Sequence, residues 1–414
     1  MITETTTGKV RGAEPGAVTA FRGIPYAHAA RFAAPGPVTP WAGVRAAEEP
    51  GPAAPQLPSR LASLMGRYEL AQDEDCLTVN VWAPPGSGHP VFVFLHGGGF
   101  SSGAGSLAWY DGAELAEREN IVVVTANYRL GALGYLRRPG VSPGNLGLRD
   151  QLAALRWVHA NITEFGGDPR AVTIAGQSAG AYSILALLGS GQLTGLAHRA
   201  ILQSTPTGLP PQAPEEAERI APRLLKELAI APDDALRLRD VPVTDLLAAQ
   251  AVVMRSAPDA TSPVPAFHLI AEADLVPTDL LAAAGKHSGA VELMIGSNRD
   301  EGTAFAPNNP DAARAVTEEM FTAPTHQLAR LVGEKQQPWL YRFDWAPAES
   351  PLGACHCLEL PFVFGNAAAW RDAPMLAGRH PTDLTTRVMR AWGGFVRDGS
   401  PGWASGTTYS IDER

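Results

Sequence analysis

The chain has 414 residues, of which 45% are hydrophobic and 18% charged, and its formal net charge is −9. This balance is ordinary for a soluble globular protein with a large core, and the lack of a basic stripe argues against a nucleic-acid partner. No segment approaches the roughly 18 apolar residues of a membrane span, and residues 1–9 lack the basic and apolar regions of a secretory signal, so we expect a cytoplasmic protein.

The first third of the chain predicts several strands. Residues 8–12 and 20–26 are predicted as short strands around a turn, and residues 33–64, rich in proline and alanine, as irregular but packed. Buried strands are predicted at residues 77–82, 91–95 and 121–126. Continuous apolar runs of this length are typical of strands buried on both faces of a mostly parallel sheet.

Helix and strand patterns alternate through the rest of the chain. From Leu148 to Ile162 apolar residues recur every three or four positions, which predicts a helix, and a strand follows at 171–175. Further strands are predicted at 200–203, 291–295 and 340–344, and a late amphipathic helix at 384–395. This alternation predicts an α/β fold with a doubly wound, mostly parallel central sheet.

One segment, residues 212–286, has a mostly helical pattern with little strand signal. We interpret it as a helical insertion or cap beside the sheet. The chain shows no internal repeat and no low-complexity segment, and α/β proteins of this length often form one continuous sheet. Residues 1–414 are therefore predicted to form a single α/β domain.

The sequence G-Q-S-A-G at residues 176–180 lies between a predicted strand and a predicted buried helix at 181–188. A serine in such a turn is the nucleophile elbow, which lifts the hydroxyl clear of the sheet edge. The flanking glycines are needed because side chains would clash across so tight a turn. The context predicts Ser178 as a nucleophile. Ser101 matches the same pattern, but it follows a glycine run on a loop and no helix begins beneath it.

A serine hydroxyl needs a base to accept its proton, and the base needs an acid to hold its orientation. In this kind of fold the chain order is serine, acid, histidine. The loop after the strand at 291–295 presents two carboxylates, Asp300 and Glu301. Three histidines follow, namely His326, His356 and His380. Spacing alone leaves both choices open, with His356 the leading base.

The run from His96 to Gly99 follows a predicted buried strand and is similar to the glycine run that supplies oxyanion donors in lipases and esterases. The N–H groups of Gly98 and Gly99 would supply two donors, and that of Ala179 a third. The alternative is a glycine-rich turn needed only for backbone conformation, and the presence of the Ser178 motif argues against it.

These motifs together resemble those of the type-B carboxylesterases, the cholinesterase-like branch of the α/β-hydrolase superfamily. The matching stretches are residues 21–27 (FRGIPYA), 74–77 (EDCL), 80–82 (NVW), 96–100 (HGGGF), 127–130 (NYRL), 144–148 (GNLGL), 150–151 (DQ), 165–169 (FGGDP), 298–302 (NRDEG) and 353–362 (GACHCLELPF). The resemblance implies the α/β-hydrolase fold and a Ser-Glu-His triad of Ser178, Glu301 and His356. It also implies an oxyanion hole formed by Gly98, Gly99 and Ala179, and an ion pair between Arg31 and Glu74.

The chain departs from the family pattern at several points. Relatives usually carry glutamate at the position of Gln177, beside the catalytic histidine, and the stretch from Leu61 to Glu74 has no tryptophan, so choline-like esters are disfavoured. Cys357 replaces the small residue that commonly follows the base. Only 55 residues separate Glu301 from His356, fewer than usual in the family, which predicts a shallower, more open pocket.

The three cysteines, Cys76, Cys355 and Cys357, are an odd and sparse set that is typical of reduced thiols. Cys355 and Cys357 flank His356, but further ligands at metal-site spacing are missing nearby, so no metal is expected. No cofactor is implied either, because a triad and an oxyanion hole suffice for the chemistry.

The resulting expectation is a serine carboxylesterase that acts on a small-molecule ester through an acyl-enzyme intermediate. A first alternative is a catalytically silent interaction protein of the same fold, which the presence of all three triad residues disfavours. A second is an acyltransferase or amidase that uses the same triad, because the sequence does not fix the acyl acceptor.

Overall fold

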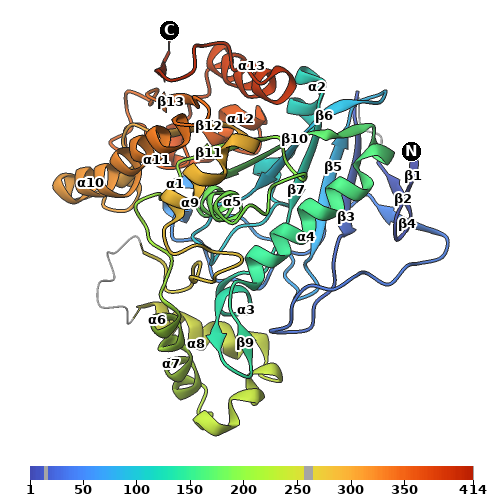
Figure 1. Cartoon of the computed structure of the whole chain (residues 1–414), viewed down its shortest axis with the longest axis vertical. Helices are drawn as coiled ribbons and strands as arrows, with labels where there is room; N and C mark the ends of the chain where they lie inside the picture. The colour runs from blue at the N-terminus through green and yellow to red at the C-terminus, as the bar shows by residue number, and fades with distance from the viewer. Residues whose placement is uncertain (14–16, 256–263, 414) are drawn as a thin grey trace.

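The computed structural model describes residues 1–13, 17–255 and 264–413 (Figure 1). Within these ranges a nine-stranded sheet has the order β14-β13-β12-β11-β10-β6-β7-β5-β3. The strands are β1 Ile2–Thr5, β2 Gly8–Gly12, β3 Thr19–Pro25, β4 Val44–Ala47, β5 Thr78–Ala83, β6 His89–Leu95, β7 Val122–Ala126, β8 Arg137–Arg138, β9 Ser142–Pro143, β10 Gly167–Gln177, β11 Arg199–Gln203, β12 Glu292–Asn298, β13 Trp339–Phe343 and β14 Thr408–Ile411. All neighbours from β14 to β7 are parallel, whereas β5 is antiparallel to both β7 and β3. The predicted α/β fold with a mostly parallel sheet is confirmed.

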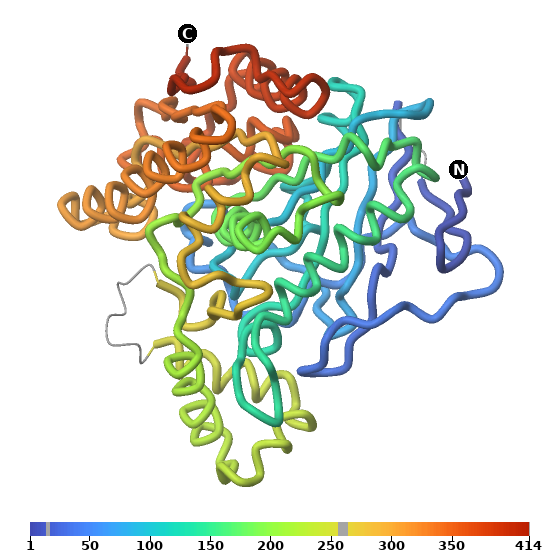
Figure 2. Tube along the Cα trace, in the orientation of Figure 1, coloured from blue at the N-terminus to red at the C-terminus, as the bar shows by residue number. Residues whose placement is uncertain are grey.

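Helices cover both faces of this sheet. The α-helices are α1 Ala62–Met65, α2 Ala113–Glu119, α3 Gly131–Tyr135, α4 Leu146–Asn161, α5 Ala179–Gly189, α6 Pro214–Glu218, α7 Ile220–Glu227, α8 Val243–Arg255, α9 Leu280–His287, α10 Pro310–Val316, α11 Ala323–Gly333, α12 Leu360–Phe364 and α13 Thr382–Asp398. Short 3-10 turns are η1 Ala108–Tyr110, η2 Ile162–Phe165, η3 Pro232–Arg239, η4 Ser288–Ala290, η5 Glu301–Ala304 and η7 Pro374–Leu376, and η6 Thr317–Thr322 is a π-helix. In Figures 1 and 2, α4 and α5 cross the front of the central strands.

The residues of β6 show how the sheet separates two cores. Val91 and Val93 pack into the cluster that contains the buried residues of α4 and α5. Phe92 and Phe94 point to the opposite face and pack against Phe364 of α12, with ring centroids 6.3 and 5.0 Å apart. Because side chains alternate along a strand, a strand buried on both faces must be apolar throughout. The prediction made from the apolar runs is confirmed.

Element boundaries differ modestly from the predicted ones. Helix α4 begins at Leu146 rather than Leu148, and η2 extends its path beyond Ile162. Within residues 33–64 the structure adds β4 and α1, and residues 33–46 are exposed or half-buried. The prediction that this segment is packed is therefore wrong for its first part. Strand β4 joins β1 and β2 in a small separate sheet, and its exposed residues explain why apolar periodicity did not reveal it.

Residues 212–286 contain α6, α7, η3, α8 and α9. Helices α6 to α8 lie at the lower end of the molecule in Figure 1, whereas α9 packs against α5 and α11 beside the sheet. The Arg31 guanidinium donates to the carbonyl of Leu238 in this segment, 3.2 Å away, and to Glu74, 2.9 Å away, so the predicted ion pair is formed. The division into one domain with an insertion stays a prediction. In the described ranges no helix is long and apolar enough to cross a membrane.

Candidate active site

The predicted site residues gather at the carboxyl ends of the parallel strands. The glycine run follows β6, Ser178 follows β10 and Glu301 follows β12, whereas His356 lies on the connection between β13 and α12. These strands are neighbours or near neighbours in the sheet. In open α/β sheets this edge is where ligands bind, because loops from adjacent strands converge there.

Ser178 occupies a strained turn between β10 and α5. Its backbone has φ 54° and ψ −119°, a conformation rare for a residue with a side chain. A Cβ atom on Gly176 would lie 2.7 Å from the carbonyl carbon of Gly180, and one on Gly180 would lie 2.1 Å from the carbonyl oxygen of Leu95. Both flanking glycines are therefore sterically required, as the sequence pattern predicts.

Glu301 and His356 form a buried pair. His356 Nδ1 lies 2.5 Å from Glu301 Oε2, and the two side chains are 1% and 0% exposed. The other carboxylate oxygen of Glu301 accepts a hydrogen bond from the backbone N–H of Asn298 at 2.7 Å. A carboxylate at Nδ1 holds the imidazole proton on that nitrogen and leaves the Nε2 lone pair as the acceptor.

The alternative acid and bases lie elsewhere. Asp300 accepts a hydrogen bond from the Ala354 N–H at 2.8 Å and pairs with Arg299. His326 is exposed on α11, and His380 stacks on Phe362 with ring centroids 4.9 Å apart. Spacing left these choices open, and in the structure only Glu301 and His356, of the two carboxylates and three histidines considered, are in contact.

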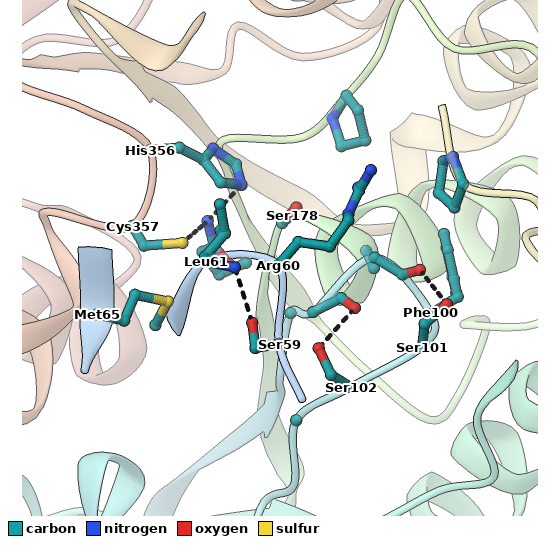
Figure 3. Close-up of a pocket in the computed structure, with 18 of the residues that line it drawn as sticks. Ser59, Arg60, Leu61, Met65, Phe100, Ser101, Ser102, Ser178, His356 and Cys357 are labelled. Atoms are coloured by element: carbon teal, nitrogen blue, oxygen red, sulfur yellow. Dashed lines mark hydrogen bonds between the residues drawn. The ribbon is translucent and has the colours of Figure 1, made fainter. Parts of the chain in front are cut away.

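The Nε2 atom of His356 faces an unexpected partner. It lies 3.1 Å from Nε2 of Gln177, which also donates to Cys357 Sγ at 3.3 Å. Among the described residues no hydrogen bond joins His356 to the Ser178 hydroxyl, although both side chains line one pocket. Burial raises the pKa of the Cys357 thiol well above its usual value, so this neighbour of Gln177 and His356 is neutral. Figure 3 shows His356, Cys357 and Ser178 around this point.

The loop after β6 is built for close backbone approach. Gly98 has φ 118° and Gly99 has φ 58°, and a Cβ atom on Gly98 would lie 2.0 Å from the carbonyl oxygen of Ser102. Ser101, the alternative serine, donates from Oγ to the Gly99 carbonyl at 3.2 Å. Among the described residues, the backbone N–H groups of Gly98, Gly99 and Ala179 have no protein acceptor. These donors are available to a ligand.

His96, at the start of this loop, has surroundings that indicate a structural role. Its ring is buried, stacks on Tyr128 at 4.2 Å between centroids, and contacts the carbonyl of Gly97 through Nδ1 at 2.7 Å. Burial lowers the pKa of His96 to about 4. A neutral, stacked imidazole fixes the path of the loop and is not a second base.

The pocket around Ser178 is mostly apolar and encloses about 980 Å³, its open mouth included. Its wall includes Leu61, Met65, Leu107, Trp109, Leu209, Met254, Phe305, Met320 and Phe321. A mostly apolar pocket with few polar groups is typical of small-molecule sites. Within the described ranges no group of three or more His, Cys, Asp or Glu side chains could hold a metal ion.

The short segment between Glu301 and His356 supplies one side of this wall. Phe305 and Phe321 each lie 5.2 Å from the His356 ring, between centroids, and they stack on each other at 6.2 Å. Phe321 belongs to the π-helix η6, a conformation often found at functional sites. The two rings restrict water around the imidazole. A pocket shallower than in relatives stays a prediction.

Behind the Glu301–His356 pair lies a buried polar network that the sequence analysis did not identify. Glu359 is fully buried and accepts hydrogen bonds from Asn298 Nδ2 at 2.8 Å and Gln203 Nε2 at 3.3 Å. Burial, together with the nearby Glu301 carboxylate, raises the pKa of Glu359 to about 7. The only sequence signal was its place three residues after His356, within a stretch that matches the family.

Replacing Glu359 with glutamine is expected to change the pH dependence of stability. Because the folded-state pKa is raised, the free energy of unfolding of the wild type falls as the pH rises from about 4.5 to about 7, by on the order of 3 kcal/mol. The variant lacks this term, so its stability relative to wild type should rise over this range. Urea unfolding at pH 5 to 8 measures the difference in the free energy of unfolding between the variant and wild type. If this difference did not change with pH, the raised pKa of Glu359 would be contradicted.

Comparison with known proteins gives a consistent result. The sequence profile of the carboxylesterase family matches residues 1–319 and, in a second segment, residues 306–409. A probable N-octanoylanthranilate hydrolase of Rhodococcus erythropolis is 41% identical, over 96% of this chain and 93% of that protein. The para-nitrobenzyl esterase of Bacillus subtilis is 37% identical, over 97% of this chain and 90% of that protein. A solved structure of a thermophilic PNB esterase covers 100% of this chain and 96% of that chain, with a TM-score of 0.90 and 34% identity.

Proposed function

The chain belongs to the carboxylesterase family and is a carboxylic ester hydrolase, and we propose that it cleaves its ester through an acyl-enzyme intermediate on Ser178. The observation that carries this proposal is the convergence of a strained serine turn and a buried His–Glu pair on one pocket. A catalytically silent protein would have no need of this arrangement, and the esterase names of the relatives argue against that alternative.

In the proposed first step, His356 Nε2 takes the proton of the Ser178 hydroxyl while Oγ attacks the ester carbonyl carbon. The Glu301 carboxylate stabilises the imidazolium that forms, because it lies 2.5 Å from Nδ1. Collapse of the tetrahedral intermediate breaks the bond to the alkoxy oxygen, and His356 returns its proton to the leaving alcohol. Water then repeats the sequence on the acyl-enzyme and releases the acid.

The developing oxyanion is proposed to bind the N–H groups of Gly98, Gly99 and Ala179. The argument is that their donors lack protein acceptors within the described residues and lie at the pocket that Ser178 lines. Such preorganised donors stabilise the charge that appears in the transition state more than the neutral ester.

Gln177 has to release His356 Nε2 before the serine can use it. The amide N–H of Gln177 and the hydroxyl of Ser178 would both donate to the lone pair on His356 Nε2. In this structure the Gln177 amide is the donor. Active-site hydrogen bonds are often loose without substrate and tighten in the reacting complex. We propose that substrate binding moves the Gln177 amide toward Cys357 Sγ, its second partner.

The apolar wall favours an acyl group of medium length. One relative is named for an N-octanoyl substrate, which is an amide with such a chain, so amide hydrolysis by the same triad is the second candidate function. A comparison of p-nitrophenyl octanoate with octanoyl p-nitroanilide separates the two, and product partition between water and added alcohols detects acyl transfer.

Stoichiometric phosphorylation tests the nucleophile directly. Diethyl p-nitrophenyl phosphate should release one equivalent of p-nitrophenolate and leave a stable diethylphosphoryl group on the peptide that contains Ser178, because an activated serine attacks phosphorus as it attacks a carbonyl. Peptide mass spectrometry locates the group. Ser101→Ala is the matched control and should be labelled as wild type is, whereas a label on Ser101 would refute the proposal.

A further inference from the structure

We propose that Arg60 makes this site selective for esters that carry a carboxylate, by binding that carboxylate beside the scissile bond. This inference rests on the proposed function, because it assigns a substrate class to the same pocket. It is carried by three observations on the described residues: the position of the guanidinium, the charges of the pocket wall, and the access of solvent to the arginine.

Arg60 lies on the segment that precedes α1 and forms one wall of the pocket. The segment is held by local hydrogen bonds, with Leu61 N–H donating to Ser59 Oγ at 3.1 Å. A Cβ atom on Gly99 would lie 3.4 Å from Arg60 Nη2, so the guanidinium is next to the glycine loop. Figure 3 shows the Arg60 side chain extending into the pocket in which Ser178 and His356 lie. An anion bound by Arg60 would therefore be a few atoms from the reacting carbonyl.

The charges of the lining point the same way. Among the described lining residues, Arg60 is the permanent cation and none is aspartate or glutamate. Gln177, which contacts His356, is neutral, and Glu301 lies behind His356 and outside the lining. The described lining therefore carries net positive charge, which attracts anionic substrates and disfavours cationic ones.

The arginine is both accessible and partly desolvated. Arg60 is exposed to solvent and lines the pocket, as contact with an entering substrate requires. The protein that surrounds it lowers the pKa of Arg60 by burial, which means that the charged form has lost part of its hydration. The planar guanidinium of Arg60 matches the two oxygens of a carboxylate, so the two groups can form a pair of parallel hydrogen bonds.

Two matched substrate pairs test this inference. The first is 4-butyryloxybenzoate against 4-butyryloxybenzamide, which places the carboxylate on the leaving group. The second is mono(4-nitrophenyl) adipate against 4-nitrophenyl hexanoate, which places it on the acyl group. In wild type the carboxylate partner of at least one pair should have the higher kcat/KM, and this ratio should fall about 10- to 100-fold in Arg60→Gln, the range for a hydrogen bond to a charged group.

The ratio within each pair cancels any general loss of activity in the variant. Arg60→Lys should retain part of the preference, because the charge remains while the bidentate geometry is lost. Arg67→Gln is the matched control, since Arg67 follows shortly after α1, is exposed and lies outside the pocket lining. High salt should reduce the wild-type ratio. Unchanged ratios in Arg60→Gln for both pairs would overturn the inference, whereas a wild type that hydrolyses none of the four esters would overturn the proposed function itself.

Discussion

Replacing Ser178 with alanine is expected to lower kcat for p-nitrophenyl esters by roughly 10⁴- to 10⁶-fold. The variant keeps the oxyanion donors and the apolar pocket but lacks the oxygen that forms the acyl-enzyme. The strained φ of 54° at this position has no other evident purpose than to present a side chain above the sheet edge. Alanine differs from serine only in lacking the hydroxyl group, and the two residues have similar backbone preferences. We therefore expect the fold to be unaffected.

Initial rates with p-nitrophenyl acetate, butyrate and octanoate measure this effect. Ser101→Ala is again the control, and we expect it to retain activity within a few-fold, because Ser101 Oγ contacts only the Gly99 carbonyl among its described partners. If Ser178→Ala retained substantial activity while Ser101→Ala lost it, the nucleophile would be Ser101.

The fold and the strained turn at Ser178 are predictable from the sequence for one reason. Both depend on local sequence patterns. Continuous apolar runs specify strands that are buried on both faces. Glycines at 176 and 180 specify a tight turn, because a side chain at either position would clash with the backbone. Each of these patterns lies within a stretch of about a dozen residues, so it can be recognised without knowing which distant segments meet in the fold. Short exposed strands such as β4 have no apolar pattern and escape this kind of analysis.

The proposed partners of Ser178 are harder to predict because they depend on how distant loops meet. Spacing could not separate Glu301 from Asp300, although the two carboxylates differ completely in the structure, one facing His356 and the other a backbone N–H. Family resemblance, not physical reasoning on the sequence, made the choice. The Gln177 contact to His356 could not be foreseen at all, because it depends on a side-chain conformation.

Replacing Glu301 with glutamine is the second substitution with a large expected effect, a loss of about 10⁴-fold in kcat. The backbone N–H of Asn298 points at Glu301 Oε1 from 2.7 Å and would keep an oxygen of the new amide in that place. The amide NH₂ would then face His356 Nδ1, which could only accept, so the imidazole proton would move to Nε2. A protonated Nε2 cannot take the proton of Ser178.

Asp300→Asn provides the matched control, because it makes the same chemical change one residue away. Its amide oxygen can still accept from Ala354 N–H, so we expect less than about a tenfold loss, in line with a moderate change to a partly exposed contact. Steady-state kinetics on p-nitrophenyl butyrate, with thermal unfolding to verify the fold, compares the two variants. Equal losses would mean that the carboxylates act through the loop they share, and the specific pairing of Glu301 with His356 would then not explain the activity.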